Sequence, residues 1–431
     1  MKLHGKTAAE IVDCVRTLVQ SGQLASGDSL PPVRDLADEL GINRNTVASA
    51  YRRLVTSGIA VTQGRLGTTI RNQYAQGEQE GAMPDTPLED LASGNPNPAW
   101  LPDLAQTLLA ARRPPRLYGE PTVNAALESH IRAWCAPDCP PGFEVDLAHG
   151  AVDAIERLLS LDLLAGDKVA VENPCFLSGI NTLRNLGLQP IGVGVDGEGM
   201  LVAELESALD KGAQAVILTP RAHNPTGCSL SDKRARAIAR VLARYPHVLV
   251  IVDDHFALLS NADYHSVIPR GAGRWALIRS FAKALGPDIR VAAVASDPAT
   301  SRQLRQRLAV GTAWVSHLLQ DMVELTLASP DGARLIGQAR QDYTRRRRDL
   351  EAALREQEIG YVADGDGLNL WIPLAVDDRG VALALARQGW LVRHGEGFSV
   401  DQEVKGVRIT ISTIEPEQCR RLALAIRRSL G

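Results

Sequence analysis

Apolar residues recur at helical spacing in three runs within the first 56 residues of the chain. The run over residues 7–18 predicts one helix, and a short second helix is expected over residues 33–40, after a proline placed to open it. Asn43 is a good N-cap for a third helix, whose apolar stripe consists of Val47, Ala50, Tyr51 and Leu54. The chain is therefore predicted to begin with three helices.

Two short strands are expected to follow the third helix. Residues 59–63 and 68–71 fit strands, and the turn Gly64-Arg65-Leu66-Gly67 lies between them. Three helices followed by a hairpin is the element order of a winged helix-turn-helix. We therefore expect a winged helix-turn-helix domain, mainly α-helical with a β wing, over residues 1–73.

Further along, short apolar runs that fit buried strands alternate with helical patterns such as that of residues 233–245. The strand runs are residues 168–172, 215–219, 248–252 and 291–295. This alternation is typical of an α/β domain in which helices cover both faces of a mostly parallel central sheet. We place this domain over residues 93–431.

Residues 74–92 lie between the two expected domains. They hold five acidic and no basic residues, and their Gly and Pro content disfavours helices. This composition predicts a linker.

Charge is distributed unevenly between the two parts. The chain of 431 residues has a net charge of −3, but residues 1–73 carry nine Lys or Arg against six Asp or Glu. A basic end on an acidic body favours nucleic-acid binding by that end. No apolar run reaches the roughly 18 residues of a membrane span, the start lacks a secretory signal, and six scattered cysteines make no disulfide framework. We therefore expect a cytoplasmic protein with no membrane partner.

The exposed side of the third helix carries side chains suited to DNA. The N-terminal end of a recognition helix meets base edges, the start of the preceding helix meets phosphate, and a wing adds further contacts. The alternative is a three-helix domain whose arginines are only solvated. The candidate DNA-binding residues are Arg34, Arg44, Asn45, Thr46, Ser49 and Arg65.

Ligands of parallel sheets bind at the carboxyl ends of strands, so the residues after each expected strand are candidates for a site. Asn224 follows one strand, Asp253 another and Lys283 a third. The chain has only seven lysines, and an apolar setting lowers the pKa of a lysine, which makes its amine usable for a Schiff base. Two alternatives stay open: Lys283 is a solvated lysine at a helix start, or Asp254 faces the ligand instead of Asp253. We favour Asp253 because it ends the strand.

Two other patterns have plain interpretations. The four arginines of residues 345–348 are expected on the solvated face of a long helix, and not at a second DNA site. The nine histidines show no metal-ligand spacing, so we expect no metal site.

The first domain resembles the GntR family of winged-helix repressors. The motifs that carry this resemblance are residues 30–37, 43–47, 50–54 and 64–68. The resemblance implies that double-stranded DNA is a partner. Pro32 stands where the family commonly has Ser, so one hydroxyl contact to phosphate is lost.

Residues 90–430 resemble fold type I pyridoxal-phosphate enzymes of the aspartate aminotransferase kind. The motifs are Ser93-Gly94-Asn95-Pro96, Tyr118-Gly119, Asn224-Pro225-Thr226-Gly227 and the spacing from Asp253 to Lys283. The resemblance implies that Lys283 holds pyridoxal 5′-phosphate as an internal aldimine. Asp253 would keep the pyridine nitrogen protonated, and Asn224 would bond the phenolic oxygen.

The same resemblance assigns the remaining contacts of the cofactor. Phe176 would stack on the ring, and Tyr118 would reach the phosphate of a partner subunit's cofactor. Arg408 would take the carboxylate of a substrate or effector, since a guanidinium pairs with it at two points. The phosphate would be held by Gly150, Ala151, Val152, Ser280 and Arg290.

The chain departs from the usual pattern at two places. His255 replaces a tyrosine near the cofactor's phenolic oxygen, and is expected to contact the cofactor there. Residues 151–153 lack the Ser and two Gln common at the phosphate site, so side-chain contacts are lost while backbone donors remain.

A GntR-like domain followed by an aminotransferase-like domain is the architecture of the MocR subfamily, and on this resemblance the chain is identified as a member. The resemblance implies a transcriptional regulator switched by an effector, either pyridoxal phosphate itself or a ligand with an amino group, with a role in vitamin B6 metabolism. It further implies a head-to-tail homodimer that binds an operator with repeated half-sites.

Two other functions stay open at this point. One is a catalytically active aminotransferase with a DNA-binding appendage, for which Lys283, Asp253, Asn224 and Arg408 are all present. Its architecture and the altered positions 151–153 and 255 argue against steady turnover. The other is a dimerisation scaffold with a vestigial pocket, which predicts no bound cofactor.

Overall fold

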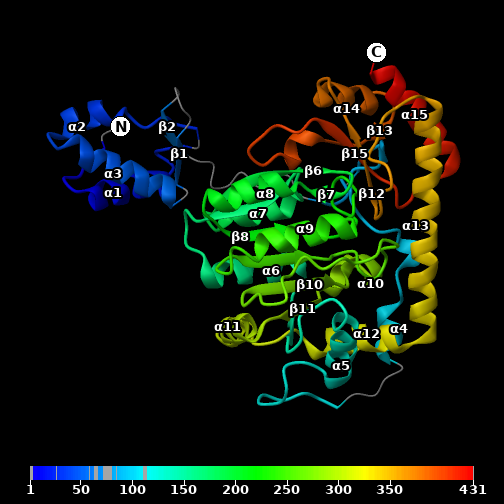
Figure 1. Ribbon diagram of the computed structural model, residues 1–431. Helices are drawn as coiled ribbons and strands as arrows, with labels where there is room; N and C mark the ends of the chain where they lie inside the picture. Colours follow the sequence, from blue (N-terminus) through cyan, green and yellow to red (C-terminus); the bar gives the residue numbers. More distant parts are fainter. Residues whose placement is uncertain are drawn as a thin grey trace. The chain divides into compact units, whose positions relative to one another are not determined.

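A computed structural model of the chain describes residues 3–25, 27–57, 59–62, 67–70, 80–83, 85–109 and 114–430. The chain divides into two compact units, formed chiefly by residues up to Gly77 and from Glu78 on. Figure 1 labels many of the helices and strands of both units.

The first unit has the predicted element order. Its elements are α1 (Ala8–Gln20), α2 (Val33–Leu40), α3 (Arg44–Thr56), β1 (Ala60–Thr62) and β2 (Thr68–Ile70). The strands pair antiparallel, with Val61 opposite Thr69. The predicted stripe of α3 packs against α1 and α2 in one core, in which Ile11, Leu36, Val47 and Leu54 are fully buried.

Side-chain caps mark the starts of α1 and α3. The Asn43 side chain accepts a hydrogen bond from the backbone N–H of Asn45 at 2.8 Å, as the sequence predicts for the start of α3. Tyr51 Oη donates to the backbone carbonyl of Pro31 at 2.7 Å, which ties α3 to the segment before α2. The cap therefore fixes the start of α3, and the Tyr51 hydrogen bond fixes its middle. Residues 63–66, which include Arg65 of the wing turn, lie outside the described residues.

An eight-stranded sheet forms the centre of the second unit. Its strands follow the order β4 (Glu144–Ala148), β11 (Ala292–Ser296), β10 (Trp275–Ser280), β9 (Leu249–Asp253), β8 (Ala213–Leu218), β5 (Lys168–Asn173), β6 (Gln189–Asp196) and β7 (Gly199–Met200). The four strands from β10 to β5 are parallel to one another, whereas β11 is antiparallel to both of its neighbours. The predicted central strands are confirmed, with bounds shifted by a few residues.

Helices cover the sheet, as the continuous burial of its strands requires. Every residue of β9, β10 and β11 is buried, so both faces of these strands are covered. The helices from this half are α4 (Leu104–Leu109), α5 (Ala125–Cys135), α6 (Ala151–Asp162), α7 (Leu177–Asn185), α8 (Val202–Asp210), α9 (Asp232–Leu242), α10 (Ala282–Leu285) and α11 (Pro298–Ala309). Among the described residues, no helix is long and apolar enough to span a bilayer.

The C-terminal part adds a small sheet and a long helix to the same core. Its helices are α12 (His317–Ala328), α13 (Pro330–Glu356), α14 (Asp378–Ala386) and α15 (Pro416–Ser429). The small sheet has the order β12 (Asn369–Pro373), β15 (Gly406–Thr410) and β14 (Arg393–His394), and β13 (Trp390–Leu391) pairs with β3 (Glu89–Asp90). Figure 1 shows α13 running from α12 to α15 along one side of the unit.

The prediction that residues 345–348 lie on a solvated face is wrong for two of the four arginines. Arg346 and Arg347 are buried. Arg346 pairs with Asp342 at 2.6 Å and donates to the Ile414 carbonyl at 2.6 Å, while Arg347 donates to the Asp366 carbonyl at 2.8 Å. Consecutive helix residues point about 100° apart, so four in a row cannot share one face.

We expect Asn43→Ala to lower the stability of the first turn of α3 by about 1 kcal/mol, because the Asn45 N–H loses its acceptor. Faster hydrogen exchange of the Asn45 amide, measured by NMR or mass spectrometry on the full chain, would show it. Asn43→Asp keeps a carboxylate acceptor and serves as the control. Unchanged exchange in the alanine variant would contradict a capping role.

Candidate functional site

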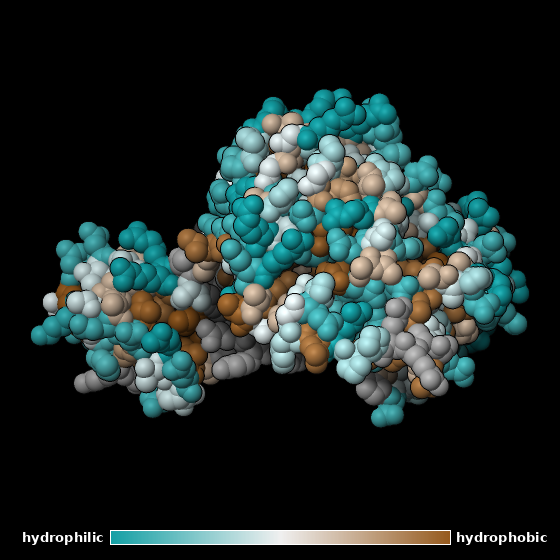
Figure 2. All heavy atoms as spheres, turned by 90° about the horizontal axis from the view of Figure 1, so that it is seen from below, coloured by the Kyte–Doolittle hydropathy of each residue, from teal (hydrophilic) through white to brown (hydrophobic). Residues whose placement is uncertain are grey.

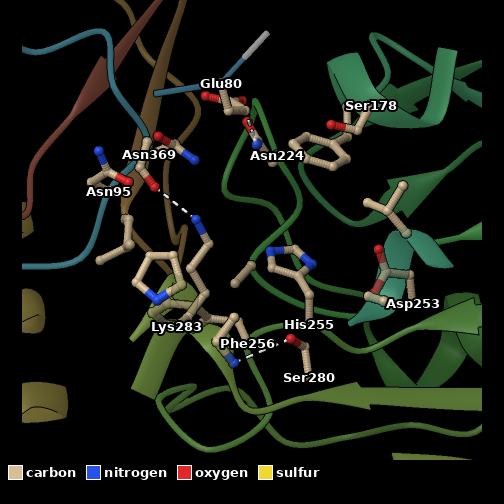
Figure 3. A pocket seen from close by; sticks show the side chains of 18 of the residues that line it. Glu80, Asn95, Ser178, Asn224, Asp253, His255, Phe256, Ser280, Lys283 and Asn369 are labelled. Carbon is tan, nitrogen blue, oxygen red and sulfur yellow. Dashed lines mark hydrogen bonds between the residues drawn. The ribbon is translucent and has the colours of Figure 1, made fainter. Parts of the chain in front are cut away.

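A cavity of about 320 Å³ opens where the parallel strands β5, β8, β9 and β10 end. Figure 3 shows the side chains that line it, with Lys283, His255 and Asp253 around the same hollow. The structure brings nine of the predicted site residues to this cavity: Ala151, Val152, Phe176, Asn224, Asp253, His255, Ser280, Lys283 and Arg290. Residues up to 139 positions apart in sequence thus meet as the parallel-sheet rule predicts.

Lys283 projects into the cavity from α10, directly after β10. Its Nζ donates a hydrogen bond to the backbone carbonyl of Gly94 at 2.7 Å. Burial lowers the pKa of this amine; Glu80 opposes the shift, and the Arg408 charge adds to it. An amine with a lowered pKa is more often neutral, and is therefore a better nucleophile toward a carbonyl.

The two neighbouring aspartates at the end of β9 have different surroundings. Asp254 is fully buried and bound at both oxygens: Arg221 donates to Oδ1 at 2.8 Å and to Oδ2 at 2.9 Å, and Arg279 to Oδ2 at 3.0 Å. Asp253 lines the cavity, and its buried Oδ1 has no hydrogen-bond partner. This geometry favours Asp253 over Asp254 as the residue that faces a ligand.

Burial, together with the negative charge of Asp254, raises the pKa of Asp253 to about 7. A positively charged N–H donor placed against Oδ1 would satisfy this oxygen and stabilise the carboxylate. The pyridinium nitrogen of pyridoxal phosphate is such a donor.

In the same cavity, the N-terminus of α6 and Arg290 form a place for an anion. Gly150 precedes α6 with φ +96°, and a Cβ there would stand 2.7 Å from Arg290 Nη2, so only glycine leaves the guanidinium in place. Ser280 and the first residues of α6, Ala151 and Val152, line the cavity. Backbone N–H groups at a helix start and a guanidinium together suit a phosphate.

Asp153 would place a negative charge near this anion site, but its carboxylate is neutralised. Arg157 Nε donates to both of its oxygens at 2.9 Å, and the His149 N–H donates to Oδ2 at 3.0 Å. The pKa of Asp153 falls, although burial opposes the shift, because Arg157 and the His149 N–H stabilise the carboxylate. The acidic residue therefore caps α6 and its charge is balanced from within the chain.

A second buried pair lies behind the cavity. His223 Nε2 stands 3.3 Å from Glu172 Oε2, and the Thr219 N–H donates to the Glu172 carboxyl at 3.1 Å. Burial raises the pKa of Glu172 to about 8 and lowers that of His223 to about 3. At neutral pH this pair is therefore a neutral acid beside a neutral imidazole. Burial and the Lys283 charge likewise lower the pKa of His255 to about 4.

Three of the predicted residues do not line the cavity of their own chain. Gly150 has no side chain, and its backbone lies against the Arg290 guanidinium. Tyr118 is 92% exposed, and its ring contacts Trp314 at 5.5 Å between centroids. Arg408 is fully buried, and its guanidinium is covered by Glu80.

Glu80 is the residue that sequence reasoning missed. Its carboxylate lies in the cavity, paired with Arg408 and accepting from Asn224 Nδ2 at 3.1 Å. It comes from the segment interpreted as a linker without chemistry. The acidic composition of that segment is a signal, but nothing local distinguishes Glu80 from the other four carboxylates.

In the first unit, the predicted DNA-binding residues gather at the start of α3. Arg44 and Asn45 are exposed there, while Thr46 and Ser49 are half-buried on the same helix. Arg34 is exposed at the start of α2, with its Nε 3.9 Å from Asp38.

Two family models match the chain. Residues 7–70 match the bacterial regulatory proteins of the gntR family, and residues 86–426 match the class I and II aminotransferases.

Similar proteins include regulators and enzymes. Over 429 residues, all of both chains, the sequence is 50% identical to the vitamin B6 salvage pathway transcriptional repressor PtsJ of Salmonella typhimurium. It is 23% identical over 420 residues to the probable rhizopine catabolism regulatory protein MocR of Rhizobium meliloti, covering 87% of this chain and 80% of that one. The structure of kynurenine aminotransferase from Pyrococcus horikoshii matches with a TM-score of 0.73 at 21% identity, covering 80% of this chain and 92% of that one, which shows a shared fold.

Substitution of the two aspartates should separate their roles. Asp254→Asn removes the charge that compensates Arg221 and Arg279, so we expect a loss of roughly 3 kcal/mol or more in the free energy of unfolding of the second unit. Asp253→Asn, which breaks no hydrogen bond of Oδ1, should cost much less. Thermal and denaturant unfolding of both variants without cofactor tests this, and equal losses would be the contrary result.

The cofactor-free protein should lose stability as the pH rises from about 6.5 to 8. Asp253 and Glu172 keep their protons in the folded state up to about pH 7 and about pH 8, whereas both carboxyls ionise near pH 4 in the unfolded chain. Through these two carboxyls the unfolded state binds fewer protons, which lowers the free energy of unfolding by roughly 2 kcal/mol over this window. The lowered pKa of Lys283 acts in the opposite direction. Neutral buried His223 and His255 oppose the fall only below about pH 6.5, where histidines of the unfolded chain take up protons.

Melting temperatures at the two pH values, for the wild type and for Glu172→Gln, measure this effect. The variant lacks the larger of the two contributions, so its melting temperature should change less. A fall of the same size in both proteins would rule out Glu172 as its source.

Proposed function

We propose that this chain is a transcriptional regulator whose DNA binding depends on pyridoxal 5′-phosphate held at Lys283. The chain belongs to the MocR-type regulators, in which a class I and II aminotransferase domain follows a GntR-type DNA-binding domain. The family matches confirm the fold class predicted from the sequence. One observation carries the proposal: a single cavity holds both a lysine amine of lowered pKa and a buried carboxyl oxygen without a partner.

The residues of the cavity fit the cofactor at each end. Lys283 would supply the amine for the aldehyde, Asp253 Oδ1 would accept the pyridinium N–H, and Asn224 and His255 would contact the phenolic oxygen. Phe176 would hold the ring, and the backbone of Gly150, Ala151 and Val152, with Ser280 and Arg290, would hold the phosphate. Bound pyridoxal phosphate supplies an electron-withdrawing ring and an aldehyde that reacts with amines.

The effector is either pyridoxal phosphate itself or an amine that reaches it. The vitamin B6 name of the relative at 50% identity supports a role in vitamin B6 metabolism, with the cofactor as the sensed molecule. A ligand that binds one arrangement of the protein more tightly than another shifts DNA affinity by that difference. A DNA-binding regulator of this kind acts in the cytoplasm.

We place the DNA-binding domain at residues 1–73, the linker at 74–92 and the effector-binding domain at 93–431; the two family matches cover residues 7–70 and 86–426. Arg34, Arg44, Asn45, Thr46, Ser49 and Arg65 contact the operator. Two such domains in a homodimer bind repeated half-sites.

A head-to-tail homodimer is supported by the exposed apolar residues of the second unit. Tyr118 is almost fully exposed near Leu117, and Leu109, Val310 and Leu318 are also largely exposed. Figure 2, a view from below, shows hydrophobic residues at the surface among hydrophilic ones. Tyr118 is then available for the phosphate of a partner subunit's cofactor.

A working aminotransferase is the second candidate, because Lys283, Asp253, Asn224 and Arg408 are all present. The family of regulators to which the chain belongs argues against turnover as the main function, and so does the pairing of Arg408 with Glu80. A residual half-reaction with an amino acid is compatible with the site.

The visible absorption spectrum of the purified protein tests the proposal. We expect a band that borohydride abolishes and that Lys283→Ala lacks, together with operator binding that changes when pyridoxal phosphate is added. Lys233→Ala is the matched control, since Lys233 lies on α9 and does not line the cavity. Steady conversion of amino acids at about 1 per second or more would favour the enzyme. If the protein stays colourless when pyridoxal phosphate is added, the proposed cofactor sensing is wrong. The chain would then be a DNA-binding domain joined to an aminotransferase-like scaffold.

A further inference from the structure

The place that resemblance assigns to a ligand carboxylate is filled by the chain's own carboxylate. The Arg408 guanidinium is fully buried, and both of its terminal nitrogens bind Glu80; Nη2 donates to Oε2 at 2.8 Å, and Nη1 pairs with Oε1. This two-point pairing is the one that an amino acid's carboxylate would make with an arginine.

Asn224 completes the same arrangement. Its Nδ2 donates to Glu80 Oε1 at 3.1 Å, while its Oδ1 accepts from Arg408 Nη1 at 3.0 Å. The Glu80 side chain is only 18% exposed. Glu80 therefore sits in a formed binding site, and not in a surface ion pair.

The backbone around Glu80 is shaped for this position. The Gly81 N–H donates to the Ser93 carbonyl at 3.0 Å, which ties the linker segment to the chain before Gly94. A Cβ at residue 94 would stand 2.7 Å from Glu80 Oε2, so the glycine there leaves the space that the carboxylate takes.

Neighbouring positive charges keep the Glu80 carboxylate ionised, and therefore paired with Arg408, at neutral pH. Burial opposes ionisation of Glu80, but Arg408, Asn224 and Lys283 outweigh it and hold the pKa of the carboxyl below its usual value. A second carboxylate that entered the cavity would meet an arginine already neutralised and an ionised glutamate beside it. Its binding would require displacement of Glu80 from both Arg408 and Asn224.

Resting on the function proposed above, we propose that Glu80 is a specificity-determining residue that restricts the cavity to ligands without a carboxylate. Pyridoxal phosphate needs no contact with Arg408 and is compatible with Glu80 in place. Amines that lack a carboxylate are compatible as well, whereas amino acids compete with Glu80. The sensed molecule is therefore a carboxylate-free one, of the class of vitamin B6 aldehydes or simple amines.

The specificity role of Glu80 can be tested by titration. The full-length protein is first loaded with pyridoxal phosphate and is then titrated with L-alanine or with ethylamine. The two probes share the amine and differ by the carboxylate. The change of the visible band gives the Kd of each. Glu80→Ala should lower the Kd for L-alanine by roughly tenfold or more, since a charged hydrogen-bonding partner becomes free, and should leave that for ethylamine within about twofold.

Glu89→Ala is the matched control, because Glu89 lies in the same segment, is exposed, and has a side chain that bonds only Gln418 among the described residues. Glu80→Gln keeps the shape without the charge and should give a smaller gain than Glu80→Ala. If L-alanine gains no more affinity than ethylamine, or no more than in Glu89→Ala, the specificity role is overturned.

Calorimetry with propionate on the cofactor-free protein gives a readout that needs no cofactor. We expect propionate to bind Glu80→Ala measurably more tightly than the wild type. A wild type without a visible band would overturn the proposed function, yet the propionate result would still decide whether Glu80 occupies the carboxylate site. Equal propionate binding in both proteins would overturn that occupancy.

Discussion

The pairing of Asp254 with two arginines fixes the end of β9, and the geometry of the cavity depends on it. Arg221 and Arg279 bind both Asp254 oxygens in a fully buried setting. Successive residues at the end of a strand point to opposite sides, so an anchored Asp254 directs Asp253 toward the cavity. Arg279 also pairs with Asp138, which joins β10 to the segment after α5. The neighbouring strand ends, from which Asp253 and Lys283 come, are thus held in register by charge.

This arrangement leaves the cavity with groups whose stable form depends on a ligand. Without one, burial raises the pKa of Asp253 to about 7 and lowers the pKa of Lys283. A cation at Asp253 and a covalent bond at Lys283 would satisfy both, so binding of a ligand with these two features is coupled to proton release and to stability. A pocket built in this way can report the presence of its ligand without converting it.

The sequence was sufficient to predict the site residues that follow strands. It was insufficient to predict site residues whose partners are distant in sequence. Asn224, Asp253 and Lys283 could be found because each stands at or shortly after the end of a buried strand, and the ends of parallel strands meet. Glu80 could not be found in this way, because its partner Arg408 lies 328 positions away and the segment around Glu80 has no periodic pattern. The burial of Arg346 and Arg347 was not predicted, because a run of like charges suggests a solvated face. Successive residues of a helix point in different directions, so two of the four arginines face the core.

A fully buried guanidinium requires a carboxylate, and the source of that carboxylate separates an enzyme from a sensor. A buried Arg408 left without a partner would cost roughly 3–5 kcal/mol. In an aminotransferase that cost is removed when the substrate arrives, so the arginine contributes to substrate binding. Here Glu80 removes it permanently. Arg408 is then no longer a source of affinity for amino acids, and the affinity of the cavity comes from the groups at Lys283, Asp253 and the start of α6, which are the groups that we propose would bind the cofactor.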